Sequence, residues 1–247
     1  MLGLVFFLIS IVLFLLKLRH HFDAVQKEFF NPVRVNFVIG APLLAAMVLI
    51  LSEPIVIAKG FHPGTQVTKG TFVFMALCQL VLNLYLYGRW WAGTGRSFSI
   101  ANPTYQIPIV GNFLLGIIGG GVSDQSWKHA IREIDLFFFS IGLLYITAIV
   151  LFCFHNMPHV KIGGESFFHP KNHNLHYSLF LFMAPPAIAS ISWQKITGEY
   201  AEGSKIALSI SFFFVLLCLR FLPLFFGKLG ISSWACTFPG MKFDVSC

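Results

Sequence analysis

Long runs of apolar residues follow one another along this chain and are separated by short polar connections. A membrane-spanning helix needs ~20 mostly apolar residues to cross a hydrocarbon core of ~30 Å. The pattern predicts eight such helices, over residues 2–18, 35–52, 70–87, 108–122, 134–154, 176–193, 205–226 and 229–247. Because the connections leave no room for a second domain, we expect one all-α, polytopic transmembrane domain over residues 1–247.

The predicted spans belong to two classes that alternate along the chain. The first, third, fifth and seventh runs are rich in Phe and Leu and have no proline in their middles. The other runs contain small residues and prolines, namely Pro42, Ala46, Gly111, Gly116, Pro185, Pro186 and Pro239. Small residues let helices approach closely inside a bundle, and proline removes a backbone hydrogen bond and kinks a helix. We therefore expect kinked inner helices inside a ring of outer helices, although Gly and Pro are also generally enriched in membrane helices.

The composition agrees with a membrane location. Only 11% of the residues are charged and the mean hydropathy is +0.76, whereas an ordinary soluble domain carries about 25% charged residues. The net charge of +7 could indicate nucleic-acid binding, but the chain contains no dense Lys/Arg run to follow a phosphate backbone. We therefore expect the protein to lie in a lipid bilayer and not to bind nucleic acid.

If all eight spans cross the membrane, the connecting loops alternate between its two sides, and the positive charge is distributed unevenly between these sides. The loops after the first, third, fifth and seventh spans carry ten basic and three acidic residues, and the other connections carry seven of each. Cytoplasmic loops of membrane proteins have an excess of Lys and Arg. The bias predicts that the first set of loops, which includes Arg34, Arg89 and Arg96, is cytoplasmic.

The predicted inner spans contain almost no formal charge. No Asp, Glu, Lys or Arg lies in the middle of the runs 35–52, 108–122 or 176–193. Ionisable residues inside a membrane usually mark proton relays and coupled pumps, so their absence favours passive conduction over proton-coupled transport. Backbone N–H groups, helix N-termini and hydroxyl groups such as that of Ser190 could bind an anion weakly, which suits rapid release from a pore.

Several short motifs occur together in one order along the chain. They are Glu28-Phe29-Phe30-Asn31-Pro32, Ala41-Pro42, Tyr87-Gly88-Arg89-Trp90, Ala101-Asn102-Pro103, Val110-Gly111-Asn112-Phe113, Ala184-Pro185 and Thr237-Phe238-Pro239. In order and spacing, these motifs resemble the slow-type anion channel family of plant guard cells, within the tellurite-resistance/dicarboxylate transporter superfamily. The resemblance extends from about Leu16 to Pro239.

The resemblance implies a fold of ten helices in five hairpins with pseudo-fivefold symmetry, in which inner helices kinked at prolines form the pore. The eight runs would be helices two to nine, so the first and last family helices would be missing, and a non-conducting partial product is one alternative. The resemblance also implies a homotrimer in the plasma membrane, and a regulatory kinase for full-length relatives.

The resemblance implies that Phe238 is the pore gate, because an aromatic ring can block a narrow apolar pore and favour dewetting. The alternative is that Phe238 packs in a core as one of 29 Phe residues. The expected residues that line the pore or kink its helices are Pro42, Ala46, Met47, Gly111, Asn112, Gly116, Pro185, Pro186, Ser190, Thr237 and Pro239.

The expected function is gated passage of small monovalent anions such as chloride and nitrate, without a cofactor or enzyme activity. One alternative on the same fold is a transporter that exports dicarboxylate such as malate, sulfite or tellurite. Another is a metal enzyme, because HxxxH spacings recur in a cluster formed by His155, His159, His169, His173 and His176. Helix-breaking residues interrupt this cluster and no second bank of ligands exists, so we expect an interfacial loop that binds no metal.

Overall fold

The computed structural model describes residues 2–30, 35–51, 65–91, 103–122, 126–156, 161–162, 165–166 and 177–220. The predicted span over 229–247, with Thr237, Phe238 and Pro239, lies outside the described residues. The same holds for Arg34 and Arg96.

Helices make up nearly all of the described chain. They are α1 (Leu2–His20), α2 (Phe22–Phe30), the π-helix η1 (Asn36–Gly40), α3 (Ala41–Leu51), α4 (Thr65–Trp91), the 3₁₀ helix η4 (Pro103–Gln106), α5 (Ile107–Gly120), α6 (Lys128–Asn156), the 3₁₀ helix η6 (Tyr177–Phe182), α8 (Ala184–Thr197) and α9 (Glu202–Arg220). The two short strands β1 (Lys161–Ile162) and β2 (Glu165–Ser166) pair antiparallel in the connection between α6 and η6. The all-α prediction is confirmed apart from this short hairpin.

Three helices form the outer layer of the described bundle. Within the described residues, α4, α6 and α9 contain the stretches that are long and apolar enough to cross a membrane, Lys69–Arg89, Lys128–His155 and Glu202–Arg220. Large apolar side chains remain exposed along all three, with Phe74 at 61%, Leu144 at 65% and Leu216 at 60% exposure. These helices are the third, fifth and seventh predicted runs, and their exposed apolar faces suit contact with lipid.

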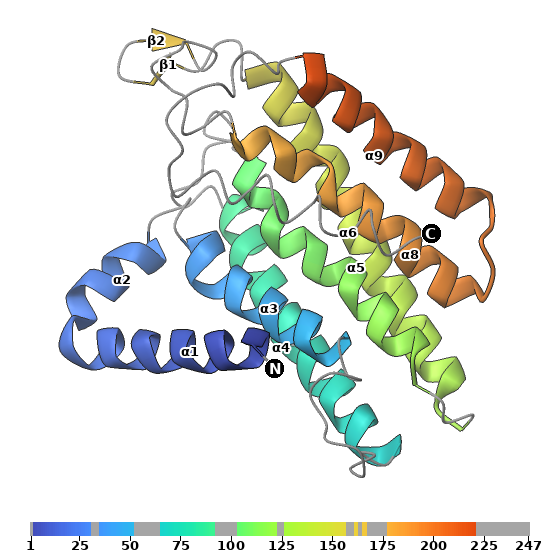
Figure 1. Ribbon diagram of the computed structural model, residues 1–247, viewed down its shortest axis with the longest axis horizontal. Coiled ribbons are helices and arrows are strands. Elements are labelled where there is room, and N and C mark those ends of the chain that lie inside the picture. The colour runs from blue at the N-terminus through green and yellow to red at the C-terminus, as the bar shows by residue number, and fades with distance from the viewer. Residues whose placement is uncertain are drawn as a thin grey trace.

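The other three helices of the bundle, α3, α5 and α8, are shorter. Most residues of α5 and α8 are buried, whereas in α3 Leu44 and Met47 are buried and most others are partly buried. Twelve of the 14 residues of α5 are buried, and α5 packs against α3, α4, α6 and α8. A helix that is apolar and buried on all sides belongs to the interior of a large protein or membrane bundle. Figure 1 shows that α3, α5 and α8 all begin at one end of the bundle, where α4, α6 and α9 end. The predicted alternation of inner and outer helices is therefore present in the described part of the fold.

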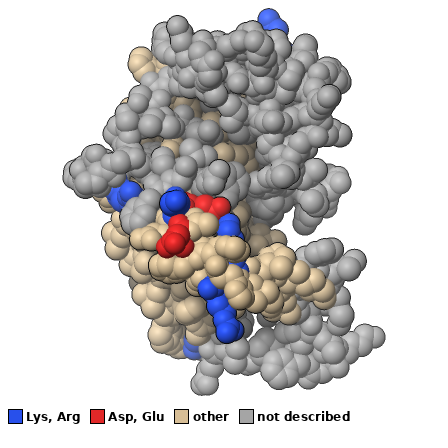
Figure 2. Space-filling view, turned by 90° about the vertical axis from the view of Figure 1, so that its left-hand side faces the viewer, with Lys and Arg blue, Asp and Glu red and all other residues tan. Residues whose placement is uncertain are grey.

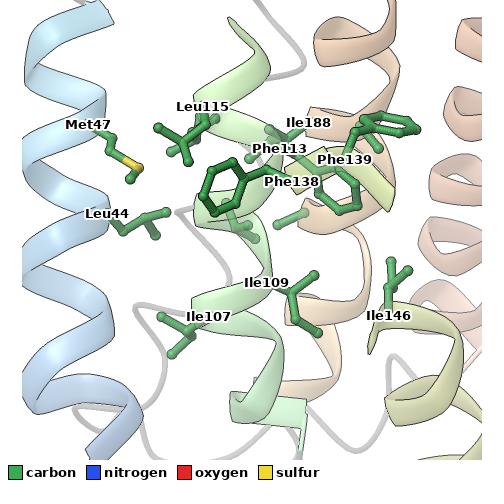
Figure 3. Packing of buried hydrophobic residues seen from close by; sticks show 14 of the residues in the cluster. Leu44, Met47, Ile107, Ile109, Phe113, Leu115, Phe138, Phe139, Ile146 and Ile188 are labelled. Carbon is green, nitrogen blue, oxygen red and sulfur yellow. The ribbon is translucent and has the colours of Figure 1, made fainter. Parts of the chain in front are cut away.

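Aromatic side chains fill the space between α5, α6 and α8. The ring of Phe113 is fully buried and meets Phe139 edge-on, with 5.3 Å between ring centroids. Phe139 in turn lies 5.2 Å from the Trp193 ring of α8. Figure 3 shows Phe113, Phe138 and Phe139 gathered on this side of α5, away from α3. These aromatic rings form the part of the core on the α6 and α8 sides of α5, and Leu44 and Met47 extend the core to the α3 side.

The helix α1 has a different orientation from the bundle. Figure 1 shows it lying across the direction that α3, α5 and α8 share. It packs against α2 and α3, and Lys17 Nζ donates a hydrogen bond to Glu28 Oε2 at 2.6 Å. Figure 2 faces this corner and shows basic and acidic side chains next to each other on it. The predicted apolar helix over 2–18 is confirmed, while its role as an outer membrane span remains a prediction.

Candidate functional site

Each inner helix contains a proline just after an irregular turn. Pro42, Pro108 and Pro185 are the second residues of α3, α5 and α8, and the preceding segments are η1, η4 and η6. A proline cannot donate a hydrogen bond to the carbonyl four residues earlier, and its ring crowds that carbonyl. At Pro42 the chain widens into a π-turn, where the N–H of Ala41 donates to the carbonyl oxygen of Asn36. The predicted irregularity at Pro42 and Pro185 is thus present as a change of helix type.

Neighbouring helices supply hydrogen bonds to backbone carbonyls at these junctions. Gln79 Nε2 in α4 donates to the Pro108 carbonyl oxygen at 2.8 Å. Ser211 Oγ in α9 donates to the Met183 carbonyl oxygen, directly before α8, at 2.9 Å. Irregular backbone is tolerated at membrane depth only where protein or water satisfies its polar groups. The outer helices therefore stabilise the junctions of the inner ones.

A cavity of about 190 Å³ lies where the three junctions meet. The residue before each junction proline lies on its wall: Ala41 of α3, Ile107 of α5 and Ala184 of α8. The rest of the wall consists of Leu44, Ala45, Gln106, Val110 and Leu181. Figure 3 shows Leu44 and Ile107 directed into the space between α3 and α5. The same structural position in three successive inner helices thus surrounds one space, as expected for helices arranged about an axis.

Gln106 is the one polar residue on the wall of this cavity, and no lining residue carries a charge. It is the last residue of η4 and is 1% exposed. The Gln106 side chain makes no capping hydrogen bond to the start of α5. Sequence reasoning placed Gln106 in the connection before the fourth span and so missed it. A polar residue two positions before a junction proline was the signal that could have identified it.

Asn112 lies on the other side of α5, against α4. Asn83 Nδ2 donates to Asn112 Oδ1 at 2.6 Å, and Gln79 Nε2 donates to the same oxygen at 3.1 Å. All three side chains are buried. Asn112 therefore connects α5 to α4 and is not among the residues that line the cavity. Its predicted role in lining a pore remains a prediction.

The two predicted glycines of α5 lie at close helix contacts. A Cβ added at Gly111 would lie 2.9 Å from Gln79 Cδ of α4. A Cβ added at Gly116 would overlap Ser192 Oγ and lie 3.0 Å from Ile196 Cδ1, both of α8. Real Cβ atoms rarely approach other atoms this closely, so both positions require glycine for the present packing. The helix contacts explain these glycines without a pore.

The remaining predicted site residues in the described region surround the cavity without forming its wall. Met47 is fully buried and points from α3 toward α5, as Figure 3 shows, while Ala46 is partly buried. Pro42 lines a separate, wider groove of about 730 Å³ between α1 and α3. Pro186 is buried at the start of α8, and Ser190 Oγ donates to the Ser204 carbonyl oxygen of α9 at 2.7 Å. Ser190 thus joins an inner helix to an outer one.

Arg89 lies in the last turn of α4, beside the end of α2. Its Nη1 donates to Tyr85 Oη at 3.1 Å, and Tyr85 Oη donates to the Phe29 carbonyl oxygen at 3.4 Å. The guanidinium carbon also lies 5.6 Å from the centroid of the Tyr85 ring. This contact brings together two segments, α2 and the end of α4, that the sequence assigned to one side of the membrane.

A buried carboxylate was also missed by sequence reasoning. Asp135, counted above as a charge of the side opposite Arg89, lies in α6, is 1% exposed and contacts Gly119 of α5. Its Oδ1 makes no hydrogen bond to any described residue. Asp135 therefore lies at the contact of α6 with α5, near the start of the predicted span over 134–154.

Of the five histidines in the predicted cluster, the described residues include His155. His155 lies at the end of α6, and its side chain is exposed. His159, His169, His173 and His176 lie outside the described residues. Among the residues that are described, no group of three or more His, Cys, Asp or Glu side chains could hold a metal ion.

These features define a class: an α-helical, multi-pass membrane protein in which proline-interrupted inner helices enclose an apolar cavity. The chain matches the family described as "Voltage-dependent anion channel" over residues 1–246, and it belongs to that family. The family is one of channels and not of enzymes.

Curated relatives from Arabidopsis thaliana agree with this family. The chain is 35% identical to S-type anion channel SLAH2 over 92% of its own length and 40% of that protein. It is 31% identical to S-type anion channel SLAH3, over 96% of this chain and 35% of that protein. It is 30% identical to guard cell S-type anion channel SLAC1, over 94% of this chain and 39% of that protein. The chain therefore spans about two fifths of the length of these three relatives.

Proposed function

We propose that this protein is a gated channel for small monovalent anions such as chloride and nitrate, and that anions pass through the cavity between α3, α5 and α8. The observation that carries the proposal is the meeting of three proline junctions around one cavity that has no charged wall residue. A pore must bind an ion weakly enough to release it quickly, and an apolar wall without a charged residue meets that condition. The names of the relatives, all S-type anion channels, support the choice of anions.

The orientation of the inner helices favours anions as well. All three begin at the same end of the bundle, so the positive ends of their macrodipoles face one side. The contact of Tyr85 with Phe29 supports placing the loops after α1 and α4 on that same side. We propose that this side is cytoplasmic and that Arg34, Arg89 and Arg96 raise the local anion concentration there.

The remaining parts of the proposal concern residues outside the described range and the assembled protein. Phe238, between Thr237 and Pro239, is the proposed gate, on the strength of the motif alone. A single transmembrane domain over 1–247, a homotrimer and a plasma-membrane location are proposed from the family resemblance. Regulation by a kinase is proposed only for longer relatives.

Flux measurements on the purified protein in liposomes test the proposal. We expect nitrate and chloride flux that rises linearly with driving force, and a gain of flux for Phe238→Ala. Phe212→Ala is the matched control, because Phe212 is 55% exposed on α9 and should leave flux unchanged. Saturable flux would indicate a carrier in place of a channel, and absence of anion flux would contradict the proposed function.

A further inference from the structure

We propose that two side chains of the outer helices, those of Ser211 and Gln79, hold the cavity open by fixing the backbone turns that form its wall. They are positioning residues, because neither lines the cavity and each acts through a carbonyl group of an inner-helix junction. The inference rests on the proposed function in one respect, since conduction requires this opening only if anions pass through the cavity.

The cavity is apolar, and an empty apolar space inside a protein is costly to keep. Its volume is about 190 Å³, and its wall consists mainly of alanine and branched aliphatic side chains. Atoms that border an empty space lose van der Waals contacts, and neighbouring groups relax into such a space where the backbone permits. Pro108 and Pro185 donate no backbone hydrogen bond, so the turns at the starts of α5 and α8 lack part of the regular helix bonding. The wall would therefore relax inward unless contacts outside the cavity held these turns.

The turn that leads into α8 lines the cavity and also contacts α9. Leu181 and Ala184 lie on the cavity wall. Between them, the Met183 carbonyl oxygen accepts a hydrogen bond from Ser211 Oγ of α9 at 2.9 Å. The bond that the same oxygen accepts from the Ala187 N–H is longer, at 3.3 Å. The shorter bond thus comes from the outer helix, and it fixes the turn from outside the cavity.

An aromatic contact holds the same turn against α9. The ring of Phe182 stacks on that of Phe214, with 5.5 Å between centroids and 20° between the ring planes. Phe214 lies three residues after Ser211 on α9, and Phe154 of α6 stacks on both rings. The rings place the turn beside α9, and the hydroxyl group of Ser211 fixes the direction of its carbonyl group.

The start of α5 has the same arrangement with a different outer helix. Ile107 and Val110 line the cavity, and the Pro108 carbonyl oxygen between them accepts from Gln79 Nε2 of α4 at 2.8 Å. Gln79 is 1% exposed and is not part of the wall. In both inner helices, two wall residues three positions apart thus flank a carbonyl group that is bonded to an outer helix. This recurrence on separate helices supports one role for both hydrogen bonds.

The reaction of a single cysteine measures the opening of the cavity without conduction. Val110→Cys, in the full chain without its native cysteines, is treated in detergent with a small neutral thiol reagent. Ser211→Ala should slow this reaction by about fivefold or more, the population shift expected when one buried hydrogen bond is lost. Ser211→Thr keeps the hydroxyl group and should retain most of the rate. Ser209→Ala is the matched control and should leave the rate unchanged, because Ser209 Oγ donates to the Lys205 carbonyl oxygen of its own helix.

A second pair of variants tests the start of α5. Gln79→Met removes the hydrogen bond to the Pro108 carbonyl oxygen and should also slow the cysteine reaction. Asn83→Ala loosens the cluster with Asn112 but leaves that bond in place, so it should lower the Tm and keep the reaction rate. In liposomes, Ser211→Ala should lower anion flux in parallel with the reaction rate, because both depend on the same opening.

The outcomes separate the inference from the proposed function. If Ser211→Ala keeps the reaction rate, behaves like Ser211→Thr or unfolds under the conditions of the assay, Ser211 serves packing alone and the inference is overturned, whether or not the protein conducts. If Ser211→Ala closes the cavity but the unsubstituted protein passes no anions, the positioning role is supported and the proposed function is refuted. If the reaction slows while anion flux stays the same, the positioning role is supported and the proposed pathway is refuted.

Discussion

The helices α5 and α6 pack against each other and differ in almost every other respect. The 14-residue α5 begins at a proline junction and is buried on nearly all sides. The 29-residue α6 runs without interruption and leaves Phe137, Leu144 and Leu151 more than half exposed. Both are strongly apolar, so apolar character alone does not distinguish an interior helix from one that faces lipid. Small residues and prolines do distinguish them, because they determine how closely a neighbour can approach.

Polar residues show the same difference. In α5, Asn112 is buried and hydrogen-bonded to two side chains of α4. In α6, Ser140 and Thr147 are exposed and donate to carbonyls of their own helix, at Leu136 and Leu143. The exposed polar groups of α6 are thus satisfied within their own helix, whereas the buried Asn112 of α5 has its partners on another helix.

The largest expected difference in the free energy of unfolding is between the alanine variants of two phenylalanines, one on α5 and one on α6. Phe113→Ala on α5 should lower the free energy of unfolding by about 3–5 kcal/mol, because it leaves a cavity in the core. Phe137→Ala on α6 should change it by less than about 0.5 kcal/mol, because Phe137 is 53% exposed. Chemical unfolding of both variants in the same detergent measures the difference. Equal losses would contradict the division into inner and outer helices.

The next contrast concerns hydrogen bonds. Asn112→Ala leaves the donors of Gln79 and Asn83 without their shared acceptor, and we expect a loss of about 2–3 kcal/mol. Thr147→Val on α6 loses only a bond to its own helix and should stay within about 0.5 kcal/mol. The Tm of each purified variant is the readout. A tolerated Asn112→Ala would show that α4 and α5 are not joined by this cluster.

A third contrast uses glycine. Gly116→Ala would bring a Cβ against Ser192 and Ile196 of α8, so we expect a loss of about 1–3 kcal/mol from overpacking. Gly88→Ala in α4 meets no atom within 4 Å and should stabilise the helix by up to about 1 kcal/mol. The two variants should therefore shift the Tm in opposite directions. A shift in the same direction would argue against the close contact of α5 with α8.

The smallest expected effect concerns the corner between α1 and α2. Lys17 and Glu28 form an ion pair whose side chains are 42% and 20% exposed. Exposed pairs contribute about 0–1 kcal/mol, and salt screens them. Lys17→Ala should therefore lower the Tm slightly at low salt and hardly at all at high salt. A large, salt-independent loss would mean that α1 packs more firmly than its exposed surface indicates.

Much of the architecture could be predicted from the sequence. Pro185, set among small residues, lies at the start of the largely buried α8, and the Phe-rich runs form α4, α6 and α9, whose apolar side chains remain exposed. Pro42 likewise lies at the start of α3, of which Leu44 and Met47 are buried. Those features depend on residue size and backbone chemistry, which can be read from single positions. The inner helices are therefore the more predictable part of the fold.

The direction of individual side chains could not be predicted in the same way. Because α5 is apolar on every face, its sequence gives no periodicity from which to assign one side to the cavity and another to α4. Asn112 and Ser190, both predicted as pore residues, make hydrogen bonds to neighbouring helices, and their role in a pore remains a prediction. Gln106 was missed because the 3₁₀ turn that carries it onto the cavity wall has no signature of its own.

The central claim is that anions pass between α3, α5 and α8. Its most direct test is the reaction of single cysteines with a negatively charged, membrane-impermeant thiol reagent, in a background that lacks the native cysteines at 78, 153, 218, 236 and 247. Val110→Cys, on the cavity wall, should react and be protected by nitrate, whereas Leu144→Cys, 65% exposed on the outer face of α6, should not react in a bilayer. Reaction at residue 144 without reaction at residue 110 would contradict the proposed pathway.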